Sequence, residues 1–286
     1  MGAMNERVTV GFDGSPASTR AVLWAADEAA RRSCALRIVA CYTVPAVVSP
    51  WIGVVPYDLE EIRVAAEDGV KGIVAQVRER HPDLQLEGGV VNSPPRQQLL
   101  ADAAESDLLV VGTTGAGAAE SFLLGSVAHA VARTSPCPVA LVPDVDLPAR
   151  TGRIVVGVDG SKPAMAALDW ATDLADSASA ELVVVHAWEY SKPDAHESPE
   201  GHDRAEIDAA LVLEEAVARS RERGLGPVRG DLVEASPSVA LVALAEQADL
   251  VVVGSRGRGG LRSMLFGSVA HSVGQHSPRP TVVVRD

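Results

Sequence analysis

The sequence is poor in aromatic residues, in cysteines and in long apolar runs. Phe, Trp and Tyr together make up 3% of the chain, so Ala, Val and Leu must fill the core, which favours close packing of helices on a sheet. The three cysteines, Cys34, Cys41 and Cys137, are odd in number and lack the paired spacing of a metal site. We expect them to be buried, reduced thiols of a cytoplasmic protein.

No stretch of 18 apolar residues is present, so no membrane span is expected. The N-terminus also lacks a basic segment followed by an apolar one, so we expect no secretory signal. Basic residues are scarce, with 25 Lys and Arg against 38 Asp and Glu and a net charge of −13. A surface this acidic repels phosphate backbones and anionic lipids, which argues against nucleic acids and membranes as partners.

The chain of 286 residues consists of two copies of one sequence pattern. The segment 7–15 (Arg-Val-Thr-Val-Gly-Phe-Asp-Gly-Ser) returns at 153–161 as Arg-Ile-Val-Val-Gly-Val-Asp-Gly-Ser. Later, Gly125-Ser-Val-Ala-His129 returns unchanged as Gly267-Ser-Val-Ala-His271. A repeat this long indicates a duplicated domain. We predict one domain over residues 1–143, a polar linker over 144–152 that is punctuated by Pro and Gly, and a second domain over 153–286.

Short β-branched runs alternate with helical segments in each half, which predicts a parallel sheet covered on both faces. The expected fold class is therefore α/β, with two tandem, doubly wound domains of five parallel strands each. The predicted strands cover 8–11, 36–41, 86–91, 108–111 and 139–142, and in the second half 154–157, 182–187, 228–233, 250–253 and 281–284. The predicted helices cover 16–32, 59–80, 96–105 and a segment from 126, and in the second half 163–178, 205–223, 239–247 and a segment from 268.

A glycine-rich loop follows the fourth predicted strand of each half with identical spacing. It reads Gly112-x2-Gly115-x9-Gly125-Ser126 in the first half and recurs from Gly254 to Ser268 in the second. Glycines let backbone N–H groups approach an anion, and the positive end of the following helix favours phosphate. The loop suits a nucleoside triphosphate, although it is not a Walker loop. The alternative is that the glycines only form turns and that Ser126 only caps a helix.

Asp13 and Asp159 stand at the end of the first strand of each half. In a doubly wound sheet this end lies beside the glycine-rich loop, where a carboxylate can accept hydrogen bonds from a ribose. The alternative is a turn in which the Asp caps the next helix.

With the motifs Gly-Phe/Val-Asp-Gly-Ser, Leu-Val-Val-Gly and G-x2-G-x9-G-Ser, the chain resembles the universal stress protein family, and its tandem form in actinobacteria most of all. The resemblance spans nearly the whole chain. It implies an adenine nucleotide α-hydrolase-like fold with strand order 3-2-1-4-5, pairing of the domains through strand five, and ATP with Mg²⁺ in each domain. The site residues that it implies are Gly11, Asp13, Cys41, Gly112, Thr113, Gly115, Gly125, Ser126 and Val127, and in the second half Gly157, Asp159, Ala187, Gly254, Ser255, Gly257, Arg258, Gly267, Ser268 and Val269.

The two glycine-rich loops differ in charge. The second carries Arg256, Arg258 and Arg262, where the first has Thr114, Ala116 and Glu120. Arginine offers charge and two-point geometry to phosphate, so we predict tighter ATP binding in the second domain, with a greater loss of affinity in salt. The alternative is that these arginines are solvated or face the other domain.

Three functions remain open from the sequence. The first is a stress-response regulator that binds one nucleotide in each domain and signals through its conformation or oligomeric state. The second is an enzyme, either a slow ATPase or a self-phosphorylating protein, although the motifs assign no catalytic residue and no metal ligand. The third is a structural or chaperone-like dimer in which the glycines only form turns. A homodimer and a regulatory protein are the macromolecular partners considered, and the apolar loop with Trp51 and Ile52 is predicted to serve as a lid or a self-association surface.

Overall fold

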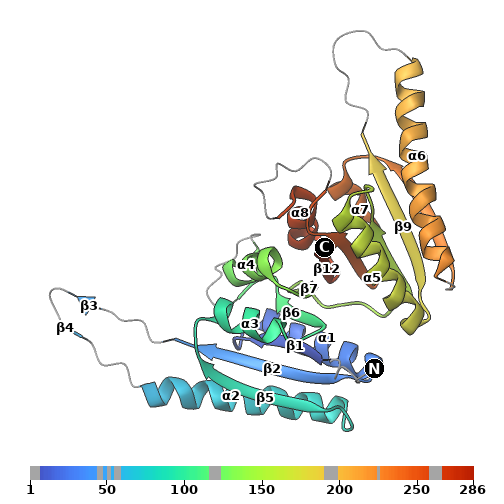
Figure 1. The fold of residues 1–286 in the computed structure, drawn as a ribbon. Coiled ribbons are helices and arrows are strands. Elements are labelled where there is room, and N and C mark those ends of the chain that lie inside the picture. The colour runs from blue at the N-terminus through green and yellow to red at the C-terminus, as the bar shows by residue number, and fades with distance from the viewer. Residues whose placement is uncertain are drawn as a thin grey trace.

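The computed structural model describes residues 7–43, 48–49, 53–54, 59–115, 124–189, 199–223, 226–257 and 266–286. Ten strands form one sheet, covered by helices, with five strands from each half of the chain (Figure 1). In the first half these are β1 (Arg7–Phe12), β2 (Ala35–Tyr42), β5 (Leu86–Asn92), β6 (Leu108–Gly112) and β7 (Val139–Val142). In the second half they are β8 (Arg153–Gly157), β9 (Glu181–Trp188), β10 (Val228–Glu234), β11 (Leu250–Gly254) and β12 (Thr281–Val284).

Each half repeats the same order of helices between its strands. The first half contains α1 (Pro16–Arg32), α2 (Leu59–Arg80), α3 (Pro95–Ala103) and α4 (Ser126–Thr134). The second contains α5 (Lys162–Ala178), α6 (Pro199–Glu222), α7 (Pro237–Ala245) and α8 (Ser268–His276). The predicted α/β fold with two tandem, doubly wound domains is confirmed, and their strands form one continuous sheet.

The strand order across the sheet is β10-β9-β8-β11-β12-β7-β6-β1-β2-β5. Counted among its own five strands, each half therefore runs 3-2-1-4-5. All neighbours within a half are parallel, and β1 lies between β2 and β6, as β8 lies between β9 and β11. The winding reverses at these central strands, and this is where a doubly wound sheet opens a crevice at its carboxyl edge.

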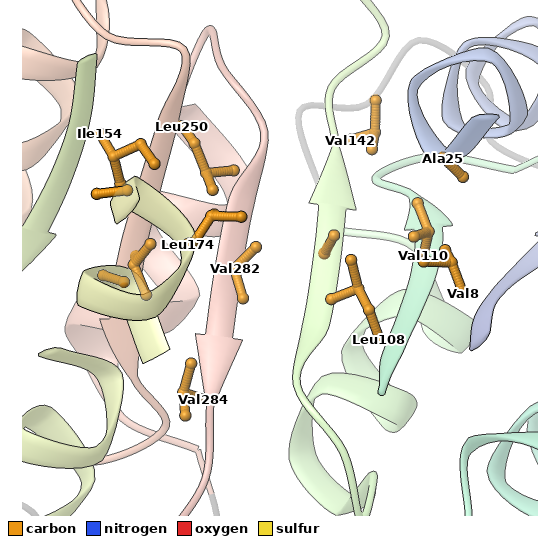
Figure 2. Close-up of a cluster of buried hydrophobic side chains, with 14 of the residues drawn as sticks. Val8, Ala25, Leu108, Val110, Val142, Ile154, Leu174, Leu250, Val282 and Val284 are labelled. Carbon is orange, nitrogen blue, oxygen red and sulfur yellow. The ribbon is translucent and has the colours of Figure 1, made fainter. Parts of the chain in front are cut away.

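The two halves join through the fifth strand of each, the pairing that the family resemblance implies. Strands β7 and β12 pair antiparallel, with Ala140 opposite Val282 and Leu141 opposite Thr281. All residues of both strands are buried. The apolar core forms one cluster on each face of the sheet, and both clusters contain residues from both halves. Figure 2 shows part of one cluster, with Val8 and Val110 from the first half and Leu174 and Val282 from the second.

Local sequence signals account for the helices that follow the first strands. The Ser15 hydroxyl accepts the N–H of Ser18 at 3.1 Å as the N-cap of α1, and Ser161 caps α5 by accepting the N–H of Ala164 at 3.4 Å. Helix α1 ends at a left-handed C-cap residue, Ser33, at φ 54°. Such end signals place α1 where the sequence predicts it.

Some elements differ from their predicted bounds. Helix α6 begins at Pro199, six residues before the predicted start. The sequence also did not predict the two-residue strands β3 (Val48–Ser49) and β4 (Gly53–Val54), which pair with each other outside the main sheet. Trp51 and Ile52, predicted to act in a lid or a contact surface, lie outside the described residues. In the described ranges, none of the helices is both long and apolar enough to cross a membrane.

Candidate functional site

A pocket opens at the carboxyl ends of β1 and β6 in the first half. Its volume is about 420 Å³, and its walls come from the ends of β1, β2 and β6 and from the starts of α3 and α4. The lining residues are Gly11, Phe12, Asp13, Ser18, Val39, Cys41, Pro95, Leu99, Val111, Gly112, Thr114, Gly115, Leu124, Gly125, Ser126, Val127 and Ala128. This is the crevice that the reversal of winding at β1 creates.

The second half repeats this pocket in the same place. Its volume is about 510 Å³. The lining residues are Gly157, Val158, Asp159, Ala164, Val185, Ala187, Pro237, Leu241, Val253, Gly254, Arg256, Gly257, Gly267, Ser268, Val269 and Ala270. Two pockets of similar size and matching position therefore lie on one sheet.

The glycines of the loop leave room that a side chain would fill. A Cβ atom on Gly115 would lie 2.9 Å from Asp13 Oδ2, and one on Gly257 would lie 2.6 Å from Asp159 Oδ2. At the floor of the second pocket, a Cβ on Gly157 would lie 2.7 Å from Leu241 Cδ1. Each contact is closer than real Cβ atoms tolerate, so glycine lets the backbone, the carboxylate and the floor come together here.

The aspartates take part in the turn and also face the loop. Asp13 Oδ1 accepts the backbone N–H of Ser15 at 3.0 Å and its hydroxyl at 2.6 Å, and Asp159 Oδ1 accepts the N–H of Ser161 at 2.9 Å. The other oxygen, Oδ2, lies beside Gly115 or Gly257. The aspartates therefore take part in the turn and line the pockets as well.

Helices α4 and α8 begin at the pockets, and within the described residues no side-chain hydrogen bond caps them. The N-cap residues are Gly125 and Gly267, and neither helix has a side-chain hydrogen bond at that position. Ser126 and Ser268 occupy the first helical position, and both are exposed. The alternative in which Ser126 only caps the helix is therefore wrong. The first N–H groups of each helix point toward the pocket end, where the helix dipole is positive and favours an anion.

Thr113 and Ser255 come directly after β6 and β11, and their backbone hydrogen bonds connect the two ends of each loop. Thr113 N–H donates to Val142 O at 2.9 Å, and its carbonyl accepts the N–H of Gly125 at 2.7 Å. Ser255 repeats both bonds, with Val284 O at 2.7 Å and with the N–H of Gly267 at 2.8 Å. Both residues are buried, and neither lines either of these two pockets.

Most of the predicted site residues come together in the two pockets. The exceptions are Thr113 and Ser255, whose backbone N–H groups are already bonded, and Arg258, which lies outside the described residues together with Arg262, Ala116 and Glu120. The next residues along the chain, Thr114 and Arg256, line the pockets instead. The predicted loop residues that the structure describes therefore line the pockets, except for the two that directly follow the strands.

Sequence reasoning missed the contribution of the third helix of each half. Leu99 and Leu241 come from α3 and α7, and Pro95 and Pro237 from the starts of these helices. The recurring Pro at the start of each helix was the available signal. It marks a helix start, but it does not say that the helix closes the pocket.

The two pockets differ in their polar side chains. Arg256 in the second pocket forms an ion pair with Asp286, at 3.1 Å from Nη2 to Oδ1, whereas Thr114 stands at the corresponding place in the first. Cys41 in the first pocket corresponds to Ala187 in the second. Burial, together with the negative charge of Asp102, raises the pKa of the Cys41 thiol to about 11. The thiol is therefore neutral at pH 7 and serves as a small, weakly polar wall.

A protein-only metal centre is not found in the part of the chain that the structure describes. No three His, Cys, Asp or Glu side chains gather there closely enough to hold an ion.

Comparison with known proteins identifies the class to which this fold and these pockets belong. The sequence pattern of the Universal stress protein family matches residues 4–143 and 151–285. The chain therefore belongs to the universal stress protein family, with two family segments in tandem. It is 35% identical over 291 residues to universal stress protein Rv2623 of Mycobacterium tuberculosis, covering 98% of this chain and 96% of that protein. It is 36% identical to Rv2005c of the same organism, covering 97% and 96%.

Solved structures share the fold over the full length. A universal stress protein from Archaeoglobus fulgidus superimposes with a TM-score of 0.69 at 19% identity, covering 98% of both chains. A functionally unknown protein, PA1789 from Pseudomonas aeruginosa, gives a TM-score of 0.62 at 18% identity, covering all of this chain and 95% of that one. At this identity the likeness concerns the arrangement of the two halves and not the ligand.

Proposed function

We propose that the chain is a regulatory protein of the stress response that binds one ATP, with Mg²⁺, in each pocket. One observation carries the proposal. In both halves, a glycine-rich loop and a helix start without a side-chain cap meet at the carboxyl edge of a parallel sheet. Such a start presents unbonded N–H groups and a positive dipole end to an anion, against an otherwise acidic protein.

The residues present fit a nucleoside triphosphate. Gly115, Gly125 and Ser126 would hold the phosphates through backbone N–H groups and a hydroxyl. Asp13 lines the pocket at the end of β1, and its carboxylate would accept a ribose hydroxyl. Bound ATP would supply a triphosphate that carries Mg²⁺ with it. Cys41 would form part of the apolar wall beside the adenine.

The second pocket would use the same backbone groups. Gly257, Gly267 and Ser268 replace the phosphate-binding residues of the first pocket, and Asp159 replaces the carboxylate. Both pockets lie on one sheet, with their helices packed on a shared core. Nucleotide occupancy would therefore be read by a partner as a change in the conformation or the oligomeric state of the whole chain.

The test is to denature the purified protein and analyse the released small molecules. We expect two ATP per chain in the wild type. The Gly115→Leu and Gly257→Leu variants should each yield one ATP per chain, because the added side chain fills the space beside Asp13 or Asp159. Gly72→Leu is the matched control, since Gly72 lies exposed in α2 with nothing within 4 Å of its Cβ position.

Other outcomes would distinguish the remaining functions. Accumulation of ADP beyond one turnover per site would favour a slow ATPase, and phosphate retained on the denatured chain would favour a self-phosphorylating protein. Absence of nucleotide, together with no rise in melting temperature on adding Mg²⁺ and ATP, would refute the proposal, because a bound ligand must stabilise the folded state.

A further inference from the structure

Three aromatic rings connect the two halves on the face of the sheet that carries α4 and α8. The rings of His129 and His271 lie 5.5 Å apart, centre to centre, and nearly perpendicular, at 89°. Phe266 meets both, at 5.6 Å from His129 and 5.9 Å from His271. We call these three residues the ring cluster. In Figure 1, α4 and α8 stand next to each other where the halves meet.

Each histidine of the ring cluster lies one turn from a pocket. The N–H of His129 donates to Gly125 O at 2.8 Å, and that of His271 donates to Gly267 O at 3.0 Å. Phe266 directly precedes Gly267 in the chain. The ring cluster therefore contacts both helix starts at which the proposed phosphates would bind. Among the described residues, no other segment of the chain separates the rings from these helix starts.

Further contacts fix these helices to the opposite half. A Cβ on Gly274 of α8 would lie 2.6 Å from Leu141 Cδ1 of β7, so the helix backbone presses closely on the partner strand. The guanidinium of Arg285, just after β12, donates to Arg133 O at the end of α4. Because each helix rests on an element of the other half, a shift of one helix start changes the contacts of both.

The electrostatics of the ring cluster suit a packing contact that can adjust. Burial lowers the pKa of His129, and the charges of His271 and Arg133 lower it further, so the ring is neutral at pH 7. His271 Nδ1 is buried and has no hydrogen-bond partner among the described residues. The described contact between the two histidines is therefore ring packing and not a hydrogen bond.

We propose that the ring cluster couples the two pockets, so that a nucleotide in one raises the affinity of the other. The inference rests on the proposed function, because it names how those two sites regulate each other. Binding of an anion orders one helix start and, through the ring cluster, orders the other in advance, which lowers the cost of the second binding step. Coupling of this kind is reciprocal, and the same factor must appear whichever pocket fills first.

The experiment is calorimetric titration of the full chain with Mg²⁺ and ATP. Gly115→Leu and Gly257→Leu give the affinity of each pocket when the other cannot fill. In the wild type we expect the second ATP to bind about fivefold more tightly than these single-pocket values, the lower end of common coupling factors. Combining His129→Ala with His271→Ala should remove this fivefold gain in affinity. Each single-pocket affinity should stay within about twofold of its value without the alanine substitutions. His276 is an exposed histidine in the last turn of α8, so His276→Ala is the control and should retain the fivefold gain.

A second measurement avoids substitutions in the ring cluster. When ATP is added to Gly115→Leu, in which only the second pocket can fill, backbone hydrogen exchange over residues 126–134 of α4 should slow. Independent affinities together with unchanged exchange in α4 would overturn the coupling while leaving ATP binding intact. Coupling that survives the double alanine substitution would overturn the role of the ring cluster. A titration without any heat or stabilisation would overturn the proposed function as well.

Discussion

Glu28 and Leu174 occupy the same position in the two halves, yet one is a charged residue and the other is apolar. Glu28 is 2% exposed and pairs with Arg31 and Arg32, which follow it in α1. Leu174 is followed by Ser177 and Ala178 at the matching positions of α5. Both Glu28 and Leu174 line a small cavity of about 140 Å³ between the halves. The same backbone position therefore accepts either a satisfied ion pair or a plain apolar contact, as buried ion pairs generally can.

In the pockets, by contrast, the two halves form the same contacts. Asp13 and Asp159 accept the same turn hydrogen bond, and the N–H groups of Gly125 and Gly267 close the loop on the same carbonyl in each half. The halves thus match in the backbone contacts that form the pockets, and they differ in side chains at the junction and at the loop. The contacts that repeat are the ones that hold the proposed phosphate-binding loop in place.

The largest effect is expected from copying the second half into the first at Glu28. Glu28→Leu leaves two largely buried guanidinium groups without their carboxylate, so it should lower the free energy of unfolding by about 3 kcal/mol. Urea denaturation followed by circular dichroism measures this. The triple variant Glu28→Leu, Arg31→Ser, Arg32→Ala completes the copy and should recover much of the loss, although it also removes the contact of Arg32 over the Trp170 ring at 5.2 Å.

The contribution of Glu28 to the stability of the wild type should depend on pH. Burial by itself raises the pKa of Glu28, but the charges of Arg32 and Arg31 and their hydrogen bonds outweigh it and leave the pKa below its usual 4.5. A lowered pKa stabilises the folded state at neutral pH, and this stabilisation is lost as the pH falls below 4.5 through the folded-state value. The triple variant should lack that component, and an identical acid profile in both proteins would contradict the assignment.

A smaller effect is expected where glycine lets the sheet approach a helix. In the second half, a Cβ on Gly254 would lie 2.6 Å from Pro163 C and 2.7 Å from Ala164 N, whereas in the first half a Cβ on Gly112 would lie 3.0 Å from Ala17 C. Overpacking costs about 1 to 3 kcal/mol. Gly254→Ala should fall near the upper value and Gly112→Ala near the lower one, measured by urea denaturation. Equal losses in the free energy of unfolding would show that α1 and α5 move aside at the same cost.

The smallest effect concerns the charge in the second loop. In the Gly115→Leu background, Arg256→Thr should weaken ATP binding by about fivefold, or about 1 kcal/mol, which is below the about 1.5 to 3 kcal/mol of a full hydrogen bond to a charged group. It should also reduce the dependence of affinity on salt. The effect is limited because Arg256 must exchange Asp286 for phosphate, so Asp286→Asn should strengthen binding. Calorimetry at two salt concentrations measures both, and an unchanged affinity in Arg256→Thr would place this arginine outside the binding site.

Much of the fold could be predicted because its signals are local and occur twice. Ser15 and Pro16 define the start of α1, and the β-branched runs define the buried strands. The early start of α6 at Pro199 could not be predicted in this way, because the first turns are polar and carry little periodicity. The pair β3 and β4 is too short to give a period at all.

The site could be predicted to the level of its loops but not of every contact. Thr113 and Ser255 look like loop residues, yet their N–H groups extend the pairing to β7 and β12, which depends on the tertiary alignment of the strands. The contact of His129 with His271 depends on the antiparallel join of the halves. No spacing along one chain segment specifies such a contact, although the repeat itself marks both histidines.

The antiparallel join of β7 and β12 also has a consequence for aggregation. Two separate five-stranded sheets would present four open edges, whereas the joined sheet ends only at β5 and β10. Open edges invite pairing with strands of other molecules, and charged side chains discourage it. Glu87 on β5 is held by Arg37, and β10 carries Arg229 paired with Asp231 at 2.9 Å. Joining the halves thus removes half of the surface at which the protein would polymerise, and ion pairs protect the remainder.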